Sequence, residues 1–208
     1  KKLTLIGITG TDGKTTTATL VYETLKQAGV KVGVITTISA KYDNKEIDTG
    51  LHMTSPDPSI LQKIFKTMVD AGVTHVVCEV TAHAIDQYRF AGCHFAVSTI
   101  TNTSHEHLDY FGNMDRYILT KSKIFDQSNI SILNKDDPSY KIISSAQPKK
   151  FLSYSIDQKS DYQATDIKIS SNSLSFKIKN NSITTDSNYR YQIYNILAAY
   201  SIIDQLKI

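Results

Sequence analysis

The sequence has 208 residues, of which 40% are hydrophobic and 21% are charged, and its formal net charge is +3. This length leaves room for one sizeable core, and the small, scattered positive charge gives no indication of a nucleic-acid partner. No apolar run approaches the roughly 18 residues that span a membrane. The two cysteines, Cys78 and Cys93, lie in apolar runs, so we expect small buried thiols in a reducing, cytoplasmic compartment.

The first motif along the chain is Gly10-Thr11-Asp12-Gly13-Lys14-Thr15-Thr16, between a strand-like run at 3–9 and a helix-like run at 17–25. This arrangement is typical of a loop that holds a nucleoside triphosphate. Backbone N–H groups face the phosphates, the lysine reaches the β- and γ-phosphates, and the following threonine binds Mg²⁺. The general pattern has a glycine where this chain has Ile8. The alternative is a glycine-rich turn that holds no ligand.

Strand and helix signals then alternate up to about residue 155, which favours a mostly parallel sheet covered by helices. The apolar patterns predict strands at 32–35, 74–80, 94–100 and 130–133, a small hairpin or excursion at 38–49, and helices at 58–69 (with Asp57 as N-cap), 113–125 and 193–206. From about 160 to 190, apolar residues alternate with polar ones and predict short antiparallel strands. We therefore expect an α/β fold: a three-layer P-loop sandwich with a mostly parallel central sheet and a small antiparallel extension.

Glu79 ends one of the predicted buried strands, where an acidic side chain is costly without a charged partner. At the carboxyl end of a parallel strand it would face the phosphates, and a Mg²⁺ ion would supply that partner. The alternative is a glutamate at a strand end that points into solvent.

Two further residues follow the next predicted strand. His107 lies in the loop directly after it, where a single histidine is usually a surface or core residue. With His105 it flanks Glu106, which is only a weak zinc pattern in the absence of cysteines. Lys121 lies on the predicted helix nearby, and composition alone favours a solvated helix lysine.

Six ordered segments together resemble the central ATPase domain of the Mur ligases, most closely the MurE branch, which adds the third amino acid of the peptidoglycan stem peptide. The family's own phosphate loop also lacks the upstream glycine, which accounts for Ile8. The matching segments are Gly10-Thr11-Asp12-Gly13-Lys14-Thr15-Thr16, Thr54-Ser55-Pro56-Asp57, Glu79-Val80-Thr81-Ala82-His83-Ala84-Ile85 with Gln87-Tyr88-Arg89, Thr101-Asn102 with His107-Leu108-Asp109-Tyr110, the stretch 117–125, and Asn195-Ile196-Leu197-Ala198-Ala199.

The resemblance implies a role for each matching residue. The residues implied to bind ATP are Gly10, Thr11, Asp12, Gly13, Lys14, Thr15, Thr16, Asn102 and Asn195, with Asn195 at the adenine. Two Mg²⁺ ions are implied, one at Thr15 and the second at Glu79 and His107. Lys121 is implied to be carbamylated by CO₂, because an anionic carbamate oxygen is attracted to metal where an ammonium group is repelled. The implied catalytic residues are Lys14, Lys121 and His107, and the residues implied to bind the UDP-muramyl peptide are Thr54, Ser55, Thr81, Gln87 and Arg89.

The implied activity is that of a monomeric, ADP-forming ligase of peptidoglycan precursor synthesis. A carboxylate of UDP-MurNAc-L-Ala-D-Glu would take the γ-phosphoryl group of ATP, and an amino-acid amine would displace phosphate from the acyl phosphate. The family recognises UDP and selects the amino acid in N- and C-terminal domains, which this chain cannot hold. Since the sequence starts at Lys1 and stops within a helical pattern at Ile208, we expect residues 1–208 to be the central ATP-binding domain of a longer polypeptide, weakly active or inactive alone.

Departures from the family pattern leave alternatives open. Thr81-Ala82 stands where the family has two serines, Ser55 replaces a threonine, and Glu106 replaces an aspartate. One alternative is a related ligase, such as folylpolyglutamate synthetase or the ligase half of cyanophycin synthetase. Another is an ATP-binding module that is not catalytic on its own. An ordinary P-loop kinase is the third, although it accounts for neither Lys121 nor the His107 loop.

Overall fold

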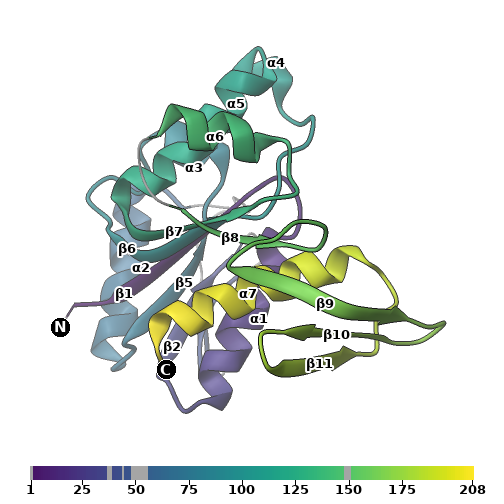
Figure 1. Ribbon diagram of the computed structural model, residues 1–208. Coiled ribbons are helices and arrows are strands. Elements are labelled where there is room, and N and C mark those ends of the chain that lie inside the picture. The colour runs from purple at the N-terminus through teal and green to yellow at the C-terminus, as the bar shows by residue number, and fades with distance from the viewer. Residues whose placement is uncertain (1, 37–38, 44, 48–55, 148–150) are drawn as a thin grey trace.

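The computed structural model describes residues 2–36, 39–43, 45–47, 56–147 and 151–208. These residues form one eleven-stranded sheet with helices on both faces (Figure 1). The strands are β1 (Thr4–Thr9), β2 (Val32–Ile35), β3 (Ala40–Tyr42), β4 (Lys45–Ile47), β5 (His75–Glu79), β6 (Phe95–Ile100), β7 (Ser128–Asn134), β8 (Leu152–Ser155), β9 (Tyr162–Ile169), β10 (Leu174–Ile178) and β11 (Asn181–Thr185). The helices are α1 (Lys14–Gln27), α2 (Pro58–Asp70), α3 (Ala82–Asp86), α4 (Leu108–Phe111), α5 (Met114–Ser122), the 3-10 helix η1 (Lys123–Gln127), α6 (Ser139–Ala146) and α7 (Tyr191–Leu206).

The strand order is β11-β10-β9-β8-β7-β6-β1-β5-β2-β3-β4. The strands from β2 across to β9 run parallel, while β3 and β4 at one edge and β10 and β11 at the other pair antiparallel. The nearly continuous burial of β1 and β5 agrees with their central position, because a parallel strand is covered by helices on both faces. The expected mostly parallel sheet and its antiparallel extension at 160–190 are therefore confirmed.

Two apolar clusters hold the layers together. On one face α1 and α7 pack against the sheet and against each other, with Val21 and Leu197 fully buried. On the other face α2 contributes Leu61 and Met68, and α5 and α6 complete that layer. The carboxyl ends of β1, β5, β6 and β7 meet between the two layers, which is where open α/β sheets bind their ligands.

Most of the predicted elements are present, with local differences. α2 begins at Pro58 after Asp57, as expected, although the Asp57 side chain makes no capping hydrogen bond. The predicted helix at 113–125 is divided into α5 and the tighter η1. The helices α3, α4 and α6 were not predicted; α3 and α4, with five and four residues, are too short to display a helical period. Cys78 and Cys93 are buried and free, as expected.

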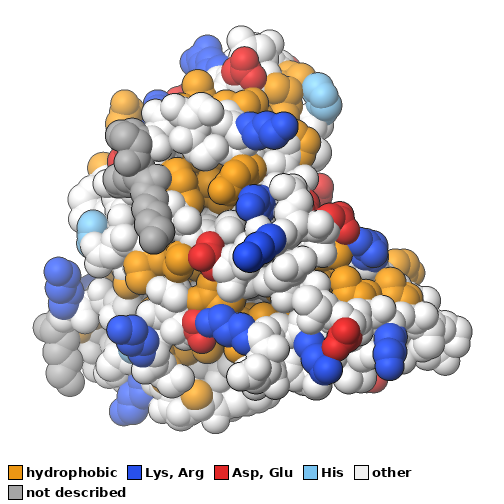
Figure 2. Space-filling model, viewed as in Figure 1, with side chains coloured by type: hydrophobic (Ala, Val, Ile, Leu, Met, Phe, Trp, Pro, Cys, Tyr) orange, Lys and Arg blue, Asp and Glu red, His pale blue; other side chains and the backbone are white. Residues whose placement is uncertain are grey.

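The surface agrees with the composition. In the part of the chain that the structure describes, no helix has both the length and the apolarity to cross a bilayer. Figure 2 shows that Lys and Arg side chains on one face are spaced among acidic and neutral ones and do not form a single patch. The positive charge is therefore as scattered on this face as the sequence indicates.

Candidate active site

The phosphate-loop motif connects the central strand β1 to the N-terminus of α1. Gly10 and Gly13 have φ angles of +150° and +78°, in a region that residues with side chains disfavour. A Cβ atom on Gly13 would also collide with the side chain of Asn195, on α7. The predicted strand, tight turn and helix are thus all present, and the N-terminal N–H groups of α1 point toward the loop.

Thr15 and Glu79 meet beside this loop. β1 and β5 are parallel neighbours with Ile8 opposite Glu79, so the end of β5 lies next to the start of α1. Thr15 Oγ1 donates a 2.9 Å hydrogen bond to Glu79 Oε2, and Glu79 is only 1% exposed. The alternative of a glutamate that points into solvent is therefore wrong. A hydroxyl beside a buried carboxylate offers the oxygen ligands that Mg²⁺ prefers.

The site suits Mg²⁺ bound together with a phosphate ligand. Among the described residues, no group of three or more His, Cys, Asp or Glu side chains is placed to hold a metal ion. Mg²⁺ usually takes one or two carboxylates and completes its shell with substrate phosphates and water. The pair formed by Thr15 and Glu79 fits that requirement. Around Glu106, the described residues include no group of three metal-binding side chains that would support the weak zinc pattern.

Two lysine amines lie against the phosphate loop. Lys14 Nζ donates a 2.7 Å hydrogen bond to the carbonyl oxygen of Thr11. Lys121 Nζ donates one of 2.8 Å to the carbonyl oxygen of Gly10 and lies 4.2 Å from the ring centroid of Tyr117. Lys121 is 1% exposed, so its interpretation as a solvated helix lysine is wrong.

Burial changes the acid–base chemistry of Lys121. Removal of the amine from water lowers its pKa to about 7, and the positive charge of Lys14 acts in the same direction. The carboxylates of Glu106 and Asp12 act in the opposite direction without restoring the usual value. At neutral pH a substantial fraction of Lys121 is therefore an uncharged amine, which is the form that reacts with CO₂.

His107 lies on the far side of the same region, at the start of α4. It has a left-handed φ of +55°, and its ring lies edge-on to the His83 ring with 4.8 Å between centroids. His107 Nε2 is 3.7 Å from Glu106 Oε1. Burial lowers the pKa of His83, and the charges of His107 and Lys121 contribute. The structure thus groups His107 with His83 and Glu106, and Lys121 lies near this group.

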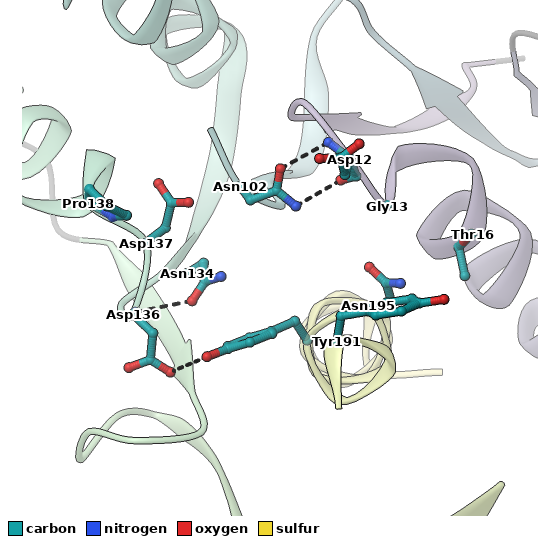
Figure 3. A pocket seen from close by; sticks show the side chains of 11 residues that line it. Asp12, Gly13, Thr16, Asn102, Asn134, Asp136, Asp137, Pro138, Tyr191 and Asn195 are labelled. Carbon is teal, nitrogen blue, oxygen red and sulfur yellow. Dashed lines mark hydrogen bonds between the residues drawn. The ribbon is translucent and has the colours of Figure 1, made fainter. Parts of the chain in front are cut away.

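Asn102 joins the loop after β6 to the phosphate loop. Its side-chain oxygen accepts the N–H of Asp12 at 2.9 Å, and its side-chain nitrogen donates to the carbonyl oxygen of Asp12 at 3.0 Å (Figure 3). Its backbone carbonyl accepts the N–H of Thr11 at 2.9 Å. Asn102 therefore braces the backbone of the phosphate loop through three hydrogen bonds.

A pocket of about 630 Å³ opens beside the phosphate loop, which is within the size range of small-molecule sites (Figure 3). Its lining residues come from the phosphate loop, the ends of β6 and β7, and α7: Asp12, Gly13, Thr16, Asn102, Asn134, Asp136, Asp137, Pro138, Tyr191, Tyr194 and Asn195. Asn195 is 6% exposed and packs against Gly13. The last helix thus brings Asn195 to the loop from the opposite end of the sequence.

Several residues of this pocket were not anticipated from the sequence. They are Tyr191 and Tyr194 on α7 and the segment Asn134-Lys135-Asp136-Asp137-Pro138, of which all but Lys135 line the pocket. A signal for the segment was present, because a run of polar residues directly follows the predicted strand at 130–133. In open α/β sheets, ligands bind outside the carboxyl ends of the parallel strands, where such a run lies.

Comparison with known proteins identifies the family. The family model described as Mur ligase middle domain matches residues 8–203. The chain belongs to the Mur ligase middle-domain family. The matched range begins within β1, ends within α7 and includes the whole candidate site.

Relatives of this Mur ligase domain are similar along nearly all of it. The UDP-N-acetylmuramoyl-L-alanyl-D-glutamate--2,6-diaminopimelate ligases of Clostridium perfringens and Corynebacterium glutamicum are 38% and 40% identical, over 97% and 93% of this chain and 44% and 37% of their own. A solved structure of such a ligase has a TM-score of 0.87 and 27% identity, covering 100% of this chain and 44% of its own. MurF ligase from Thermotoga maritima in complex with ADP shares the fold, with a TM-score of 0.69 and 20% identity over 99% of this chain and 46% of its own. The chain spans less than half the length of these relatives.

The residues expected on the substrate side of this Mur ligase domain lie around α3. Thr81 caps α3 by accepting the N–H of Ala84 at 3.1 Å. Arg89 donates to the side-chain oxygen of Gln87 from Nε at 3.0 Å and from Nη2 at 2.7 Å, and its Nε is 4.0 Å from Asp57 Oδ1. Thr54 and Ser55 lie outside the described residues.

Proposed function

We propose that residues 1–208 are the central ATP-binding domain of an ADP-forming ligase that joins an amino acid to UDP-MurNAc-L-Ala-D-Glu. The observation that carries this proposal is the buried Lys121, whose amine lies on the phosphate loop with a pKa lowered to about 7. A phosphate loop alone is compatible with kinases and many other enzymes, whereas a second, buried lysine with a lowered pKa at that loop is suited to carbamylation. Membership of the Mur ligase middle-domain family and the names of the relatives support the same conclusion.

The loop fits a nucleoside triphosphate because its glycines leave the backbone open to phosphate oxygens and α1 directs its N-terminus at them. ATP supplies the phosphoryl group that activates the substrate carboxylate. Lys14 would neutralise charge on the transferring group, with the backbone of residues 10–16 around the phosphates. Asn102 would hold the loop in shape, and Asn195 would contact the base from α7.

The metal ligands would come from both sides of the loop. Thr15 and Glu79 would bind Mg²⁺ beside the phosphates, and Glu79, His107 and a carbamate on Lys121 would serve a second ion. Carbamylation needs an uncharged amine, and the low pKa of Lys121 supplies it. The modification would also replace a cation that repels Mg²⁺ with an anion that attracts it.

The substrates would enter from the side of α3. Arg89, whose planar donor fork suits a carboxylate or a phosphate, would bind the UDP-muramyl peptide together with Thr81, Gln87, Thr54 and Ser55. The amino acid would then attack the acyl phosphate of that substrate. We further propose a cytoplasmic monomer in which the UDP end and the amino acid are bound outside residues 1–208.

A second candidate is an ATP-binding module that lacks catalytic activity on its own. It is favoured by one observation: the chain spans less than half the length of its relatives. A related ligase of the folylpolyglutamate or cyanophycin type would have the same nucleotide site with a different acceptor.

Phosphate release and ATP binding, measured on the same chain, separate these candidates. With ATP, Mg²⁺ and 2,6-diaminopimelate, the amino acid in the names of the relatives, we expect a small rise in the release rate when UDP-MurNAc-L-Ala-D-Glu is added, because its UDP end is bound outside residues 1–208, and a baseline rate with folate or cyanophycin primers. Lys14→Ala should abolish the release, and Lys63→Ala, a substitution of an exposed lysine on α2, should not. ATP binding without any stimulated release supports the module, and absence of ATP binding contradicts both candidates.

A further inference from the structure

The carboxylate of Asp137 joins two loops at the carboxyl end of the sheet. Oδ2 accepts the backbone N–H of Thr103 at 3.0 Å, and Oδ1 accepts the Thr103 hydroxyl at 2.8 Å. The same carboxylate accepts the N–H and the hydroxyl of Ser139, at the start of α6. Asp137 is thus anchored to its own loop through Ser139, and it fixes the position and orientation of Thr103 in the neighbouring loop.

The hydrogen bond to the Thr103 N–H acts on a shared peptide group. That N–H and the carbonyl of Asn102 belong to one planar unit. The carbonyl accepts the N–H of Thr11, in the phosphate loop, at 2.9 Å. Asp137 therefore binds the N–H of this peptide group, and the carbonyl of the same group binds the phosphate loop. Hydrogen bonds in such a chain also polarise and strengthen one another.

The Asn102 side chain adds to this connection. It makes two hydrogen bonds to the backbone of Asp12, one through each end of its amide. A rotation of the peptide between residues 102 and 103 would disturb these two bonds as well as the bond from Thr11. Asn134 supports the same loop at Thr101, the residue before Asn102: its side-chain nitrogen donates to the carbonyl oxygen of Thr101 at 3.1 Å. Thr101 and Ser104 also bond to the phosphate loop, through the Thr101 hydroxyl to the Asp12 carbonyl and the Ser104 N–H to the Thr11 hydroxyl. Among the contacts of the described residues, the bond from Asp137 is the one made to the N–H of the peptide between residues 102 and 103.

We propose that Asp137 is a positioning residue for the phosphate loop: it orients the peptide between residues 102 and 103 and thereby sets the loop conformation that receives nucleotide phosphates. The proposal deepens the proposed function and rests on it for the identity of the ligand. Asp137 is assigned no contact with a reacting atom, and it acts through Thr103 and Asn102.

Amide hydrogen exchange of the nucleotide-free chain tests the positioning role directly. Asp137→Asn keeps the size of the side chain but leaves one acceptor oxygen for two backbone N–H groups, those of Thr103 and Ser139, so one of them loses its acceptor. Asp161→Asn is the control for the same chemical change away from the phosphate loop, because Asp161 also accepts an N–H and a hydroxyl from one residue, Ser153, at 2.8 and 2.9 Å, both through Oδ2. We expect the amides of Thr11 and Asp12 to exchange about tenfold faster in Asp137→Asn and to change by less than about twofold in Asp161→Asn.

Two exchange results would overturn the proposal. One is unchanged protection of Thr11 and Asp12 in Asp137→Asn. The other is an equal increase in the amides of β10, because a uniform rise reports a loss of overall stability rather than a local role. If Asp137→Asn does not fold, Thr103→Val decides, since it removes only the hydroxyl bond. A rise of about threefold confined to the phosphate loop supports the proposal, and no rise refutes it.

Nucleotide binding provides a second measurement. By titration calorimetry with ADP and Mg²⁺, we expect Asp137→Asn to bind about tenfold more weakly than the wild type and Asp161→Asn to bind equally well. Unchanged ADP affinity in Asp137→Asn would refute the proposal. If the wild-type chain binds no ADP, the proposed function fails, while the exchange experiment still decides whether Asp137 positions the loop.

Discussion

Thr15 Oγ1 donates a hydrogen bond of 2.9 Å to Glu79 Oε2, although the two residues lie 64 positions apart in the sequence. The contact arises because β1 and β5 are parallel neighbours, so the first turn of α1 begins beside the end of β5. The hydroxyl satisfies a carboxylate that is almost completely buried. In the proposed function these two oxygens would bind Mg²⁺ where the end of β5 meets the first turn of α1.

Glu79→Gln tests this metal site. The amide is nearly the same shape and can still accept the Thr15 hydroxyl, so we expect the free energy of unfolding to change by less than about 1 kcal/mol. Mg²⁺ should raise the ATP affinity of the wild type about 100-fold more than it raises that of Glu79→Gln, because the variant lacks the negative charge that attracts the ion. Calorimetric titrations of ATP with and without Mg²⁺ measure this gain. Glu46→Gln, on the edge strand β4, is the control, and an equal Mg²⁺ dependence in both variants would contradict the assignment.

Lys14→Ala tests the phosphate loop itself. Removal of the amine leaves the phosphates without their nearest cation, so we expect ATP affinity to fall by about 100-fold or more. The midpoint of urea unfolding should shift little, because the Lys14 side chain has one described hydrogen bond, to the Thr11 carbonyl. Lys63→Ala should bind ATP like the wild type. Equal affinities in the two variants would show that the loop does not bind phosphate.

Lys121 should make the stability of the metal-free and nucleotide-free chain depend on pH. Its pKa is about 7 in the folded state, against 10.5 for a lysine side chain in water. Between these values the unfolded chain binds the extra proton, so the free energy of unfolding should rise with pH, by up to about 1.4 kcal/mol per unit. Lys121→Met fills similar space without a titrating group and should remove this rise. Urea titrations from pH 7 to 10 in CO₂-free buffer measure the difference, and parallel curves would exclude a lowered pKa.

Gly13→Ala and Gly29→Ala form a matched pair. Both glycines have φ near +80°, but a Cβ on Gly13 meets the Asn195 side chain whereas a Cβ on Gly29 meets nothing within 4 Å. Gly29→Ala should lower the free energy of unfolding by about 1 kcal/mol, through backbone strain alone. Gly13→Ala should lower it further and abolish ADP binding. Equal destabilisation of both variants, with ADP binding retained, would show that α7 does not pack closely on the loop.

The local parts of the site were predictable from the sequence. The strand, glycine turn and helix around residues 10–16 follow from patterns within a single segment. Glu79 could be placed because a buried parallel strand that ends in an acidic residue needs a partner. The sheet class followed from alternating apolar runs, and the antiparallel extension followed from a change in period near residue 160.

The parts that depend on distant segments could not be predicted from local patterns. A lone lysine on a helix is usually solvated, so composition did not indicate the burial of Lys121; it is buried because α5 packs over the phosphate loop. The polar run that contains Asn134 and Asp137 indicates a loop at a strand end, but it does not show which neighbouring loop these residues contact until β7 is placed beside β6. Their roles come from strand order, which hydrophobic periodicity does not encode.

The packing of Asn195 against Gly13 has a consequence for biosynthesis. A ribosome delivers β1 and the glycine turn early, yet the pocket has no wall on one side until α7 has emerged and docked. The same docking covers Ile193, Leu197 and Ile202, which would otherwise expose apolar surface on the nascent chain. We therefore expect nucleotide to bind only after α7 has docked, and saturating nucleotide should in turn hold α7 in place.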